Sequence, residues 1–161
     1  MFLAERFLEQ MESQPNYGTI LLVLCNKPEL QSHLRVSAAV TFKNFIKKRW
    51  KVLEETDFAD NISAQDRDSI KSNITELMLT SPEQIQRQLS DAISIISKED
   101  FPEKWPNLLP TLVERLNSGD FNVINGVLRT AHSIFKRYLE LNWSSFDCLK
   151  CKIKFFLKIS S

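Results

Sequence analysis

The sequence predicts an all-α protein made of stacked helical hairpins, and three observations support this fold class. Apolar residues recur at helical spacing in one segment after another along the 161 residues. The six prolines lie between these segments, as expected because proline breaks the interior of a helix. No segment alternates apolar and polar residues as a half-buried strand would.

The first three helices are expected at residues 2–13, 17–27 and 30–53. In the second segment, an almost unbroken apolar run from Ile20 to Cys25 would also fit a buried strand. Its helical neighbours favour a short, deeply buried helix. The third segment has the clearest pattern, with a wide apolar face that includes Phe42, Phe45 and Trp50 and a polar stripe opposite.

The next two helices are expected at residues 63–79 and from Ser81 to about residue 100. Ser63 is predicted to cap the first, with Asp66 in the position of a capping-box acid. Ser81 is predicted to cap the second, with Pro82 at its first position and Glu83 and Gln84 following.

Two further helices are expected at residues 107–116 and 121–138, separated by a turn in which Gly119 ends the first. Phe101 and Trp105 are predicted to pack between repeats. The inward side of the last helix is predicted to consist of its apolar residues, namely Ile124, Val127, Leu128, Ala131, Ile134 and Phe135.

The spacing of the hairpins indicates a repeat. The second helices are centred near Phe42, Asp91 and Thr130, about 40 to 50 residues apart, which fits the HEAT/armadillo period. A plain bundle would explain the helical periodicity but not this spacing. Since one hairpin cannot bury its apolar face alone, stacking into a HEAT-repeat α-solenoid is expected.

Composition argues against several functional classes. The net charge is +1, from 21 basic and 20 acidic residues, whereas a nucleic-acid binder usually carries a clear basic excess. No stretch approaches the roughly 20 apolar residues that span a bilayer, and the N-terminus does not resemble a signal peptide. Three cysteines form no disulfide framework, so a soluble protein of a reducing, intracellular compartment is expected.

No motif predicts catalysis, a cofactor or a metal site. Cys148 and Cys151 have metal-ligand spacing, but two further ligands are lacking nearby, so incidental cysteines are the better interpretation. His33 and His132 have no nucleophile motif around them. The basic cluster 47–49 with Lys51 fits cations at a helix carboxyl end slightly better than partner contact, and both fit better than a localisation signal.

Three stretches resemble a known family. Residues 38–46, AAVTFKNFI, followed by Trp50, resemble the second-repeat helix of the importin-β N-terminal domain. Residues 81–110, SPEQIQRQLSDAISIISKEDFPEKWPNLLP, and 118–138, SGDFNVINGVLRTAHSIFKRY, resemble an exportin of that superfamily. The resemblance covers roughly residues 5–138.

This resemblance implies a nuclear transport receptor. Its members are long HEAT-repeat solenoids whose N-terminal repeats bind Ran in its GTP form, and this exportin type returns importin-α from the nucleus to the cytoplasm. Shuttling between nucleus and cytoplasm is therefore expected, with Ran and importin-α as partners and no nucleic acid or membrane insertion. Binding of importin-α is expected to need more distal repeats.

In this superfamily the second helix of each repeat lines the concave side, so the polar stripes of these helices are the candidate Ran contacts. The first stripe consists of Ser37, Thr41, Asn44, Lys48 and Lys51. The second consists of Gln84, Gln88 and Asp91, and the third of Asn125, Arg129, His132 and Lys136.

The chain departs from the family pattern at both ends. It is expected to begin inside the first repeat, leaving the apolar face of residues 2–13 without a partner helix. The repeats are expected to occupy residues 1–138, and residues 139–161 do not resemble the next repeat. A truncated product without function and a generic HEAT-repeat interaction scaffold are the alternatives to a Ran-binding segment.

Overall fold

The computed structural model describes residue 6 and residues 10–51 and 62–141, and in this part of the chain all regular structure is helical. The elements are α2 (Tyr17–Asn26), α3 (Ser32–Arg49), α4 (Ala64–Thr80), α5 (Glu83–Asp100), α6 (Leu108–Arg115), the short 3₁₀ helix η2 (Leu116–Ser118) and α7 (Phe121–Leu141). The predicted all-α class is confirmed. The helix expected at residues 2–13 lies largely outside the described residues.

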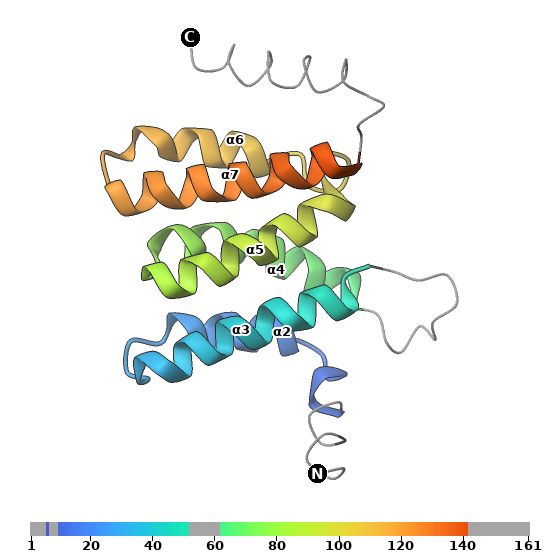
Figure 1. The fold of residues 1–161 in the computed structure, drawn as a ribbon. Helices are drawn as coiled ribbons and strands as arrows, with labels where there is room; N and C mark the ends of the chain where they lie inside the picture. Colours follow the sequence, from blue (N-terminus) through green and yellow to red (C-terminus); the bar gives the residue numbers. More distant parts are fainter. Residues whose placement is uncertain (1–5, 7–9, 52–61, 142–161) are drawn as a thin grey trace.

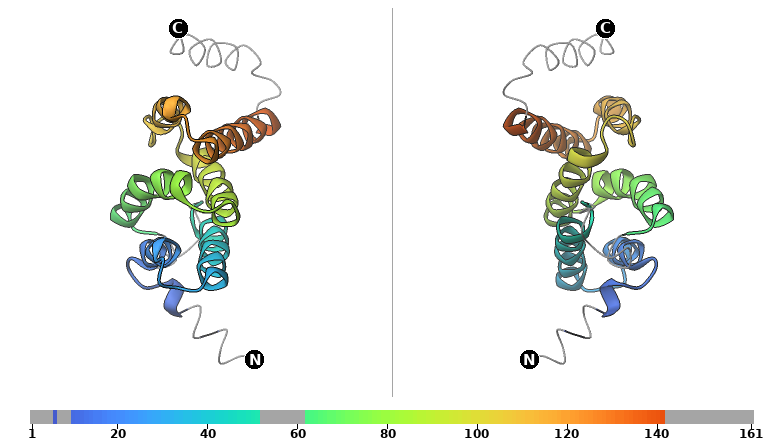
Figure 2. Two further views of the ribbon diagram at one scale, coloured as in Figure 1. Left: turned by 90° about the vertical axis from the view of Figure 1, so that its left-hand side faces the viewer. Right: turned by 90° about the vertical axis from the view of Figure 1, so that its right-hand side faces the viewer.

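The helices form three hairpins that stack along one axis (Figure 1). The pairs are α2 with α3, α4 with α5, and α6 with α7. Viewed along the helices, α3, α5 and α7 form one layer, and α2 and α4 lie beside it in a second (Figure 2). Each hairpin buries its apolar side against the next, which is the packing of an α-solenoid.

The core runs through all three hairpins without a break. Its largest fully buried side chains include Phe42, Trp50, Ile70, Leu89 and Leu108. The run from Ile20 to Cys25 is helical rather than a strand. Because successive residues of a helix point to different sides, Leu21, Leu22 and Cys25 are buried while Ile20 and Val23 are about half exposed.

The two predicted N-caps have different outcomes. Ser63 caps α4 as expected, since its Oγ accepts a hydrogen bond from the Asp66 amide at 3.1 Å. The Asp66 carboxylate itself accepts from the backbone amide of Asn16, 50 residues away, at 3.1 Å. The prediction for Ser81 is wrong, because α5 begins at Glu83 without a side-chain cap and the Ser81 hydroxyl donates back to the Leu77 carbonyl of α4 at 2.6 Å.

Three further differences concern the third hairpin. Pro110 lies inside the first turn of α6, where its missing amide breaks no helical hydrogen bond. Leu128 is 57% exposed on α7 rather than buried. The backbone of α7 continues to Leu141, three residues beyond the predicted end, whereas the predicted glycine cap is confirmed by the left-handed backbone of Gly119 at φ 72°.

A buried polar network ties the first two hairpins together where α3, α4 and α5 meet. The Asp100 carboxylate accepts from Trp50 Nε1 and from Lys71 Nζ, both at 3.2 Å, and Asp100 is only 3% exposed. Arg67 covers the Trp50 ring, with its guanidinium carbon 4.6 Å from the ring centroid, and donates to the Trp50 carbonyl at 2.7 Å. Outside this network, Trp105 is buried in the apolar core that runs through the hairpins, as predicted.

Candidate partner-binding face

The outward sides of α3, α5 and α7 form a continuous surface, which we call the parallel-helix face. The three helices run in the same direction and lie next to one another (Figure 1), with α5 packed against both neighbours. Their outward sides therefore bring together stripes that are about 40 to 50 residues apart in sequence. The three predicted polar stripes are carried by these helices, and their residues are exposed to different degrees.

The stripe on α3 lies where the sequence predicts it. All five of its residues are exposed, and they are Ser37, Thr41, Asn44, Lys48 and Lys51. Lys48 forms an ion pair with Glu12, in which its Nζ donates to Glu12 Oε2 at 3.1 Å. The other four side chains face solvent on the side away from the core.

The stripe on α5 is only partly exposed. Gln84 and Asp91 are exposed, but Gln88 is half-buried. Within the described part of the chain, the Gln88 Oε1 atom is buried and has no hydrogen-bond partner. A buried amide oxygen without a hydrogen-bond partner costs free energy.

The stripe on α7 likewise contains both exposed and half-buried residues. His132 and Lys136 are exposed, whereas Asn125 and Arg129 are half-buried. Arg129 reaches across the joint, with Nη1 3.5 Å from Gln86 Oε1 and Nη2 3.4 Å from Glu83 Oε1. Arg129 therefore helps to stabilise the packing of α7 on α5.

The face also contains a charge cluster that sequence reasoning missed. Glu83 pairs with both Arg87 and Arg129 at the amino-terminal end of α5. The hydrogen bond and charge of Arg87, with a smaller contribution from Arg129, hold the pKa of the Glu83 carboxyl below its ordinary value. The separation of four residues between Glu83 and Arg87 signals their pairing, but the link to Arg129 depends on the stacking of α5 and α7.

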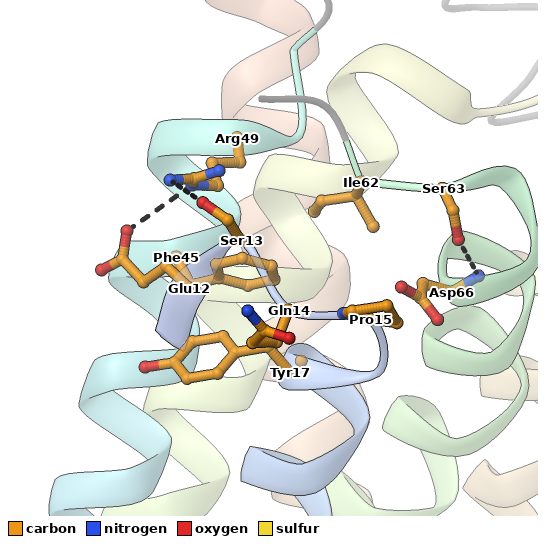
Figure 3. A pocket seen from close by; sticks show the side chains of 11 residues that line it. Glu12, Ser13, Gln14, Pro15, Tyr17, Phe45, Arg49, Ile62, Ser63 and Asp66 are labelled. Carbon is orange, nitrogen blue, oxygen red and sulfur yellow. Dashed lines mark hydrogen bonds and ion pairs between the residues drawn. The ribbon is translucent and has the colours of Figure 1, made fainter. Parts of the chain in front are cut away.

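A small cavity lies where the segment before α2 meets the carboxyl end of α3 and the amino end of α4 (Figure 3). It is a cavity of about 120 Å³ whose lining includes Glu12, Tyr17, Arg49 and Asp66. Glu12 Oε2 lies 3.5 Å from Arg49 Nε, and the Tyr17 ring packs edge-on against Phe45 at a centroid distance of 5.2 Å. Burial, with the Glu12 charge adding to it, raises the Tyr17 pKa.

These contacts explain the arrangement of the basic cluster on α3. Arg49 is 9% exposed and turns inward, whereas Lys47 and Lys51 remain exposed. The cluster is therefore divided between a structural arginine and outward lysines at the carboxyl end of α3, where the helix dipole favours cations.

The two histidines are not brought together. His33 lies at the start of α3 and His132 in the middle of α7, with α5 between them, and both are exposed. Cys25 is fully buried, and burial raises the pKa of its thiol to about 11, which keeps it protonated and unreactive. Cys148 and Cys151 lie outside the described residues.

Within the described ranges, no three His, Cys, Asp or Glu side chains are grouped as metal ligands. In the same part of the chain, no helix is long and apolar enough to cross a bilayer. The described helices present polar side chains from three successive hairpins on a helical scaffold.

Comparison with known proteins agrees with this architecture. Residues 4–80 match the importin-beta N-terminal domain. Exportin-2 of Pagrus major is 60% identical, and exportin-2 of Homo sapiens 58% identical, over 135 residues that make up 84% of this chain and 14% of each relative. The chain thus spans about one-seventh of these relatives.

Solved structures show the same relationship. The exportin Cse1 in its cargo-free, cytoplasmic state is similar to 98% of this chain and 16% of its own, with a TM-score of 0.78 and 39% identity. A bidirectional nuclear transport receptor of S. cerevisiae, Lph2, matches 84% of this chain and 14% of its own, with a TM-score of 0.72 and 27% identity.

The stacked hairpins and the importin-beta N-terminal domain define the class, a HEAT-repeat segment of a nuclear transport receptor. Within that class, the identity to the fish and human proteins shows that the chain belongs to the exportin-2 family of the importin-β superfamily.

Proposed function

We propose that the parallel-helix face is a binding surface for Ran in its GTP form. The observation that carries the proposal is geometric, because the three helices with the polar stripes come from separate repeats, lie next to one another and run in the same direction (Figure 1). Membership of the exportin-2 family supports the choice of partner. On this proposal the chain binds and does not catalyse.

The exposed members of the stripes are the best candidates for direct contact. Lys51 lies at the carboxyl end of α3, and His132 and Lys136 lie on the second half of α7, all of them exposed. Arg129 and Gln88 are more suited to supporting the surface, because both are half-buried between helices. A partner with acidic groups would meet lysines on the two outer helices.

A full-length protein of this family would return importin-α from the nucleus to the cytoplasm and would shuttle between the two compartments. Ran and importin-α would be coupled through the curvature of the solenoid, since a ligand that favours one curvature assists another that prefers the same one. A segment covering one-seventh of the relatives' length would bind Ran without this cooperativity. We propose residues 1–138 as the repeat region of the segment.

The test is calorimetry of the 161-residue chain with Ran carrying a non-hydrolysable GTP analogue or GDP. Binding of the GTP form alone is expected, and Lys51→Ala combined with Lys136→Ala should weaken it about tenfold, as expected for two contacts of roughly 0.7 kcal/mol each. The matched control is Lys27→Ala with Lys104→Ala, which removes two exposed lysines outside the parallel-helix face.

Two results would reject the proposal. A folded, helical chain that binds neither form would show that these repeats alone are not enough to bind Ran. Equal weakening by both lysine pairs would show an unspecific effect of charge rather than contact at the parallel-helix face.

A further inference from the structure

An arginine stands three residues before a serine at two places in the sequence. Arg87 precedes Ser90, and Arg115 precedes Ser118. Protein kinases choose their substrates in part by charge pattern, and one large class of them requires an arginine at this distance before the hydroxyl that is phosphorylated. Since the local pattern is the same at both places, the fold decides whether either serine can be modified.

The two serines differ in accessibility. Ser90 lies in the middle of α5 and is 0% exposed, and Thr130 Oγ1 of α7 lies 2.8 Å from its hydroxyl oxygen. Ser118 is exposed in the turn that joins α6 to α7 at one edge of the stack (Figure 1). The exposed stretch around it runs without a break over residues 117–121. An enzyme can therefore reach Ser118, but not Ser90, in the folded chain.

The turn around Ser118 is held by few contacts. Ser118 is the last residue of η2, a single 3₁₀ turn of three residues of which none is buried. Its hydroxyl oxygen accepts a long hydrogen bond, 3.3 Å, from the Asp120 amide. Little is lost when such a turn opens locally. Its residues can therefore become extended, which is the form in which a kinase binds the segment that it phosphorylates.

The same turn places Arg115 next to Ser118. Arg115 directly precedes η2, and side chains three residues apart lie above one another in a 3₁₀ turn. The Arg115 Nη2 atom now lies 2.7 Å from Glu76 Oε2 of α4, and both of these side chains are about half exposed. A phosphate carries roughly −1.5 to −2 charges and accepts two parallel hydrogen bonds from a guanidinium, so it competes well with one exposed carboxylate.

We propose that Ser118 is a phosphorylation site for a protein kinase that selects an arginine three residues before the acceptor, and that the phosphate takes Arg115 away from Glu76. The Ser118 Oγ attacks the γ-phosphorus of ATP, the bond from this phosphorus to the bridging oxygen of ADP breaks, and the catalytic carboxylate of the kinase takes the hydroxyl proton. The polar link between α4 and α6 is thereby exchanged for one within the third hairpin.

The surroundings explain why Arg115 is the partner that the phosphate needs. Asp120 caps α7, because its Oδ1 accepts from the Asn122 amide at 2.8 Å. The first amides of α7 are thus already paired with one carboxylate, and a phosphate two residues earlier meets the Asp120 charge. The guanidinium of Arg115 offsets this repulsion.

The first test is phosphorylation of the folded 161-residue chain by a calmodulin-dependent protein kinase with ATP, with the modified residues located by mass spectrometry. We expect one phosphate on Ser118 and none on Ser90, which serves as the matched internal control. Ser118→Ala should abolish the main product. Arg115→Gln should lower kcat/KM at least about tenfold, because a charged contact with the kinase is lost.

The second test is a phosphorus NMR titration of the phosphorylated chain. A neighbouring guanidinium favours the dianion, so the second pKa of the phosphate should lie below its ordinary value of about 6. In the Arg115→Gln chain, phosphorylated by prolonged reaction, this pKa should rise. Lys104→Gln removes an exposed cation at the opposite end of α6 and should leave the pKa unchanged.

Three results would overturn the proposal. A folded chain without phosphate on Ser118 would reject the site, and equal modification of Ser118 and Ser90 would show that only the unfolded chain reacts. A phosphate pKa that Arg115→Gln leaves unchanged would reject the exchange of partners. None of these measurements involves Ran, so the phosphorylation site and the proposed function stand or fall separately.

Discussion

At the scale of single residues, Gln88 is both a predicted contact and a structural weakness. Its Oε1 atom is buried without a hydrogen-bond partner, and an unsatisfied buried oxygen costs roughly 1–3 kcal/mol. Gln88→Leu should therefore raise the free energy of unfolding by up to about 1 kcal/mol in urea titrations. Gln84→Leu, at an exposed position four residues earlier, is the control and should give no gain.

The same substitution separates stability from binding. If Gln88 contacts Ran directly, Gln88→Leu will weaken binding of the GTP form although the chain is more stable. Unchanged affinity would restrict the contact set on α5 to Gln84 and Asp91. If Gln88→Leu instead destabilised the chain, the buried amide oxygen would not be a source of instability.

At the scale of helices, the break between α4 and α5 depends on Ser81. The hydroxyl is buried and donates to the Leu77 carbonyl, so Ser81→Ala should cost about 1 kcal/mol of unfolding free energy. Ser81→Asp distinguishes the two possible roles. Aspartate is as good an N-cap as serine, but it cannot donate when ionised and would bury a charge.

Ser81→Asp is therefore expected to destabilise the chain more than Ser81→Ala, measured by thermal and urea unfolding followed by circular dichroism. Ser63→Asp, at the confirmed N-cap of α4, is the matched control and should be nearly neutral. If Ser81→Asp were neutral too, the N-cap expected from the sequence would be right after all.

Ser81 also shows what local sequence cannot determine. The tetrapeptide Ser-Pro-Glu-Gln fits the start of one helix and the end of the preceding one, and the choice depends on which carbonyl the packed hairpin leaves unpaired. Helix existence was predictable, because the 3.6-residue period of apolar residues is local. The burial of Ser81 is a property of the hairpin.

The candidate site shows the same distinction between features that local sequence determines and features that helix packing determines. The stripe on α3 was predictable as an exposed set, because local periodicity determines which side faces outward. The half-burial of Gln88 and Arg129 was not, since it depends on how closely α5 approaches its neighbours. Leu128 was expected inward only because it is apolar, yet it lies on a side of α7 that no described element covers.

At the scale of the whole molecule, cooperativity depends on contacts that cross between hairpins, and Asp100 on α5 makes one of them, to Trp50. Its carboxylate joins Trp50 at the end of α3 to Lys71 on α4 and is almost fully buried. Asp100→Asn keeps an acceptor for the indole but removes the charge that pairs with Lys71. We expect a loss of about 2 kcal/mol in the free energy of unfolding, the usual size for a hydrogen bond to a charged group.

The measurement is urea unfolding followed by tryptophan fluorescence and by circular dichroism. A double-mutant cycle with Lys71→Met should show a coupling energy of at least about 1 kcal/mol, because the two side chains form one network. Asp68→Asn removes the exposed partner of the same lysine, whose carboxylate lies 3.3 Å from Lys71 Nζ, and should cost under about 0.5 kcal/mol. If both aspartate variants cost the same, burial would not be what makes Asp100 important. The Lys71–Asp100 pair, which lies within the second hairpin, would then stabilise the chain no more than an exposed ion pair does. The first two hairpins would be held together by apolar packing and by their other polar contacts, such as the one from Arg67 to the Trp50 carbonyl.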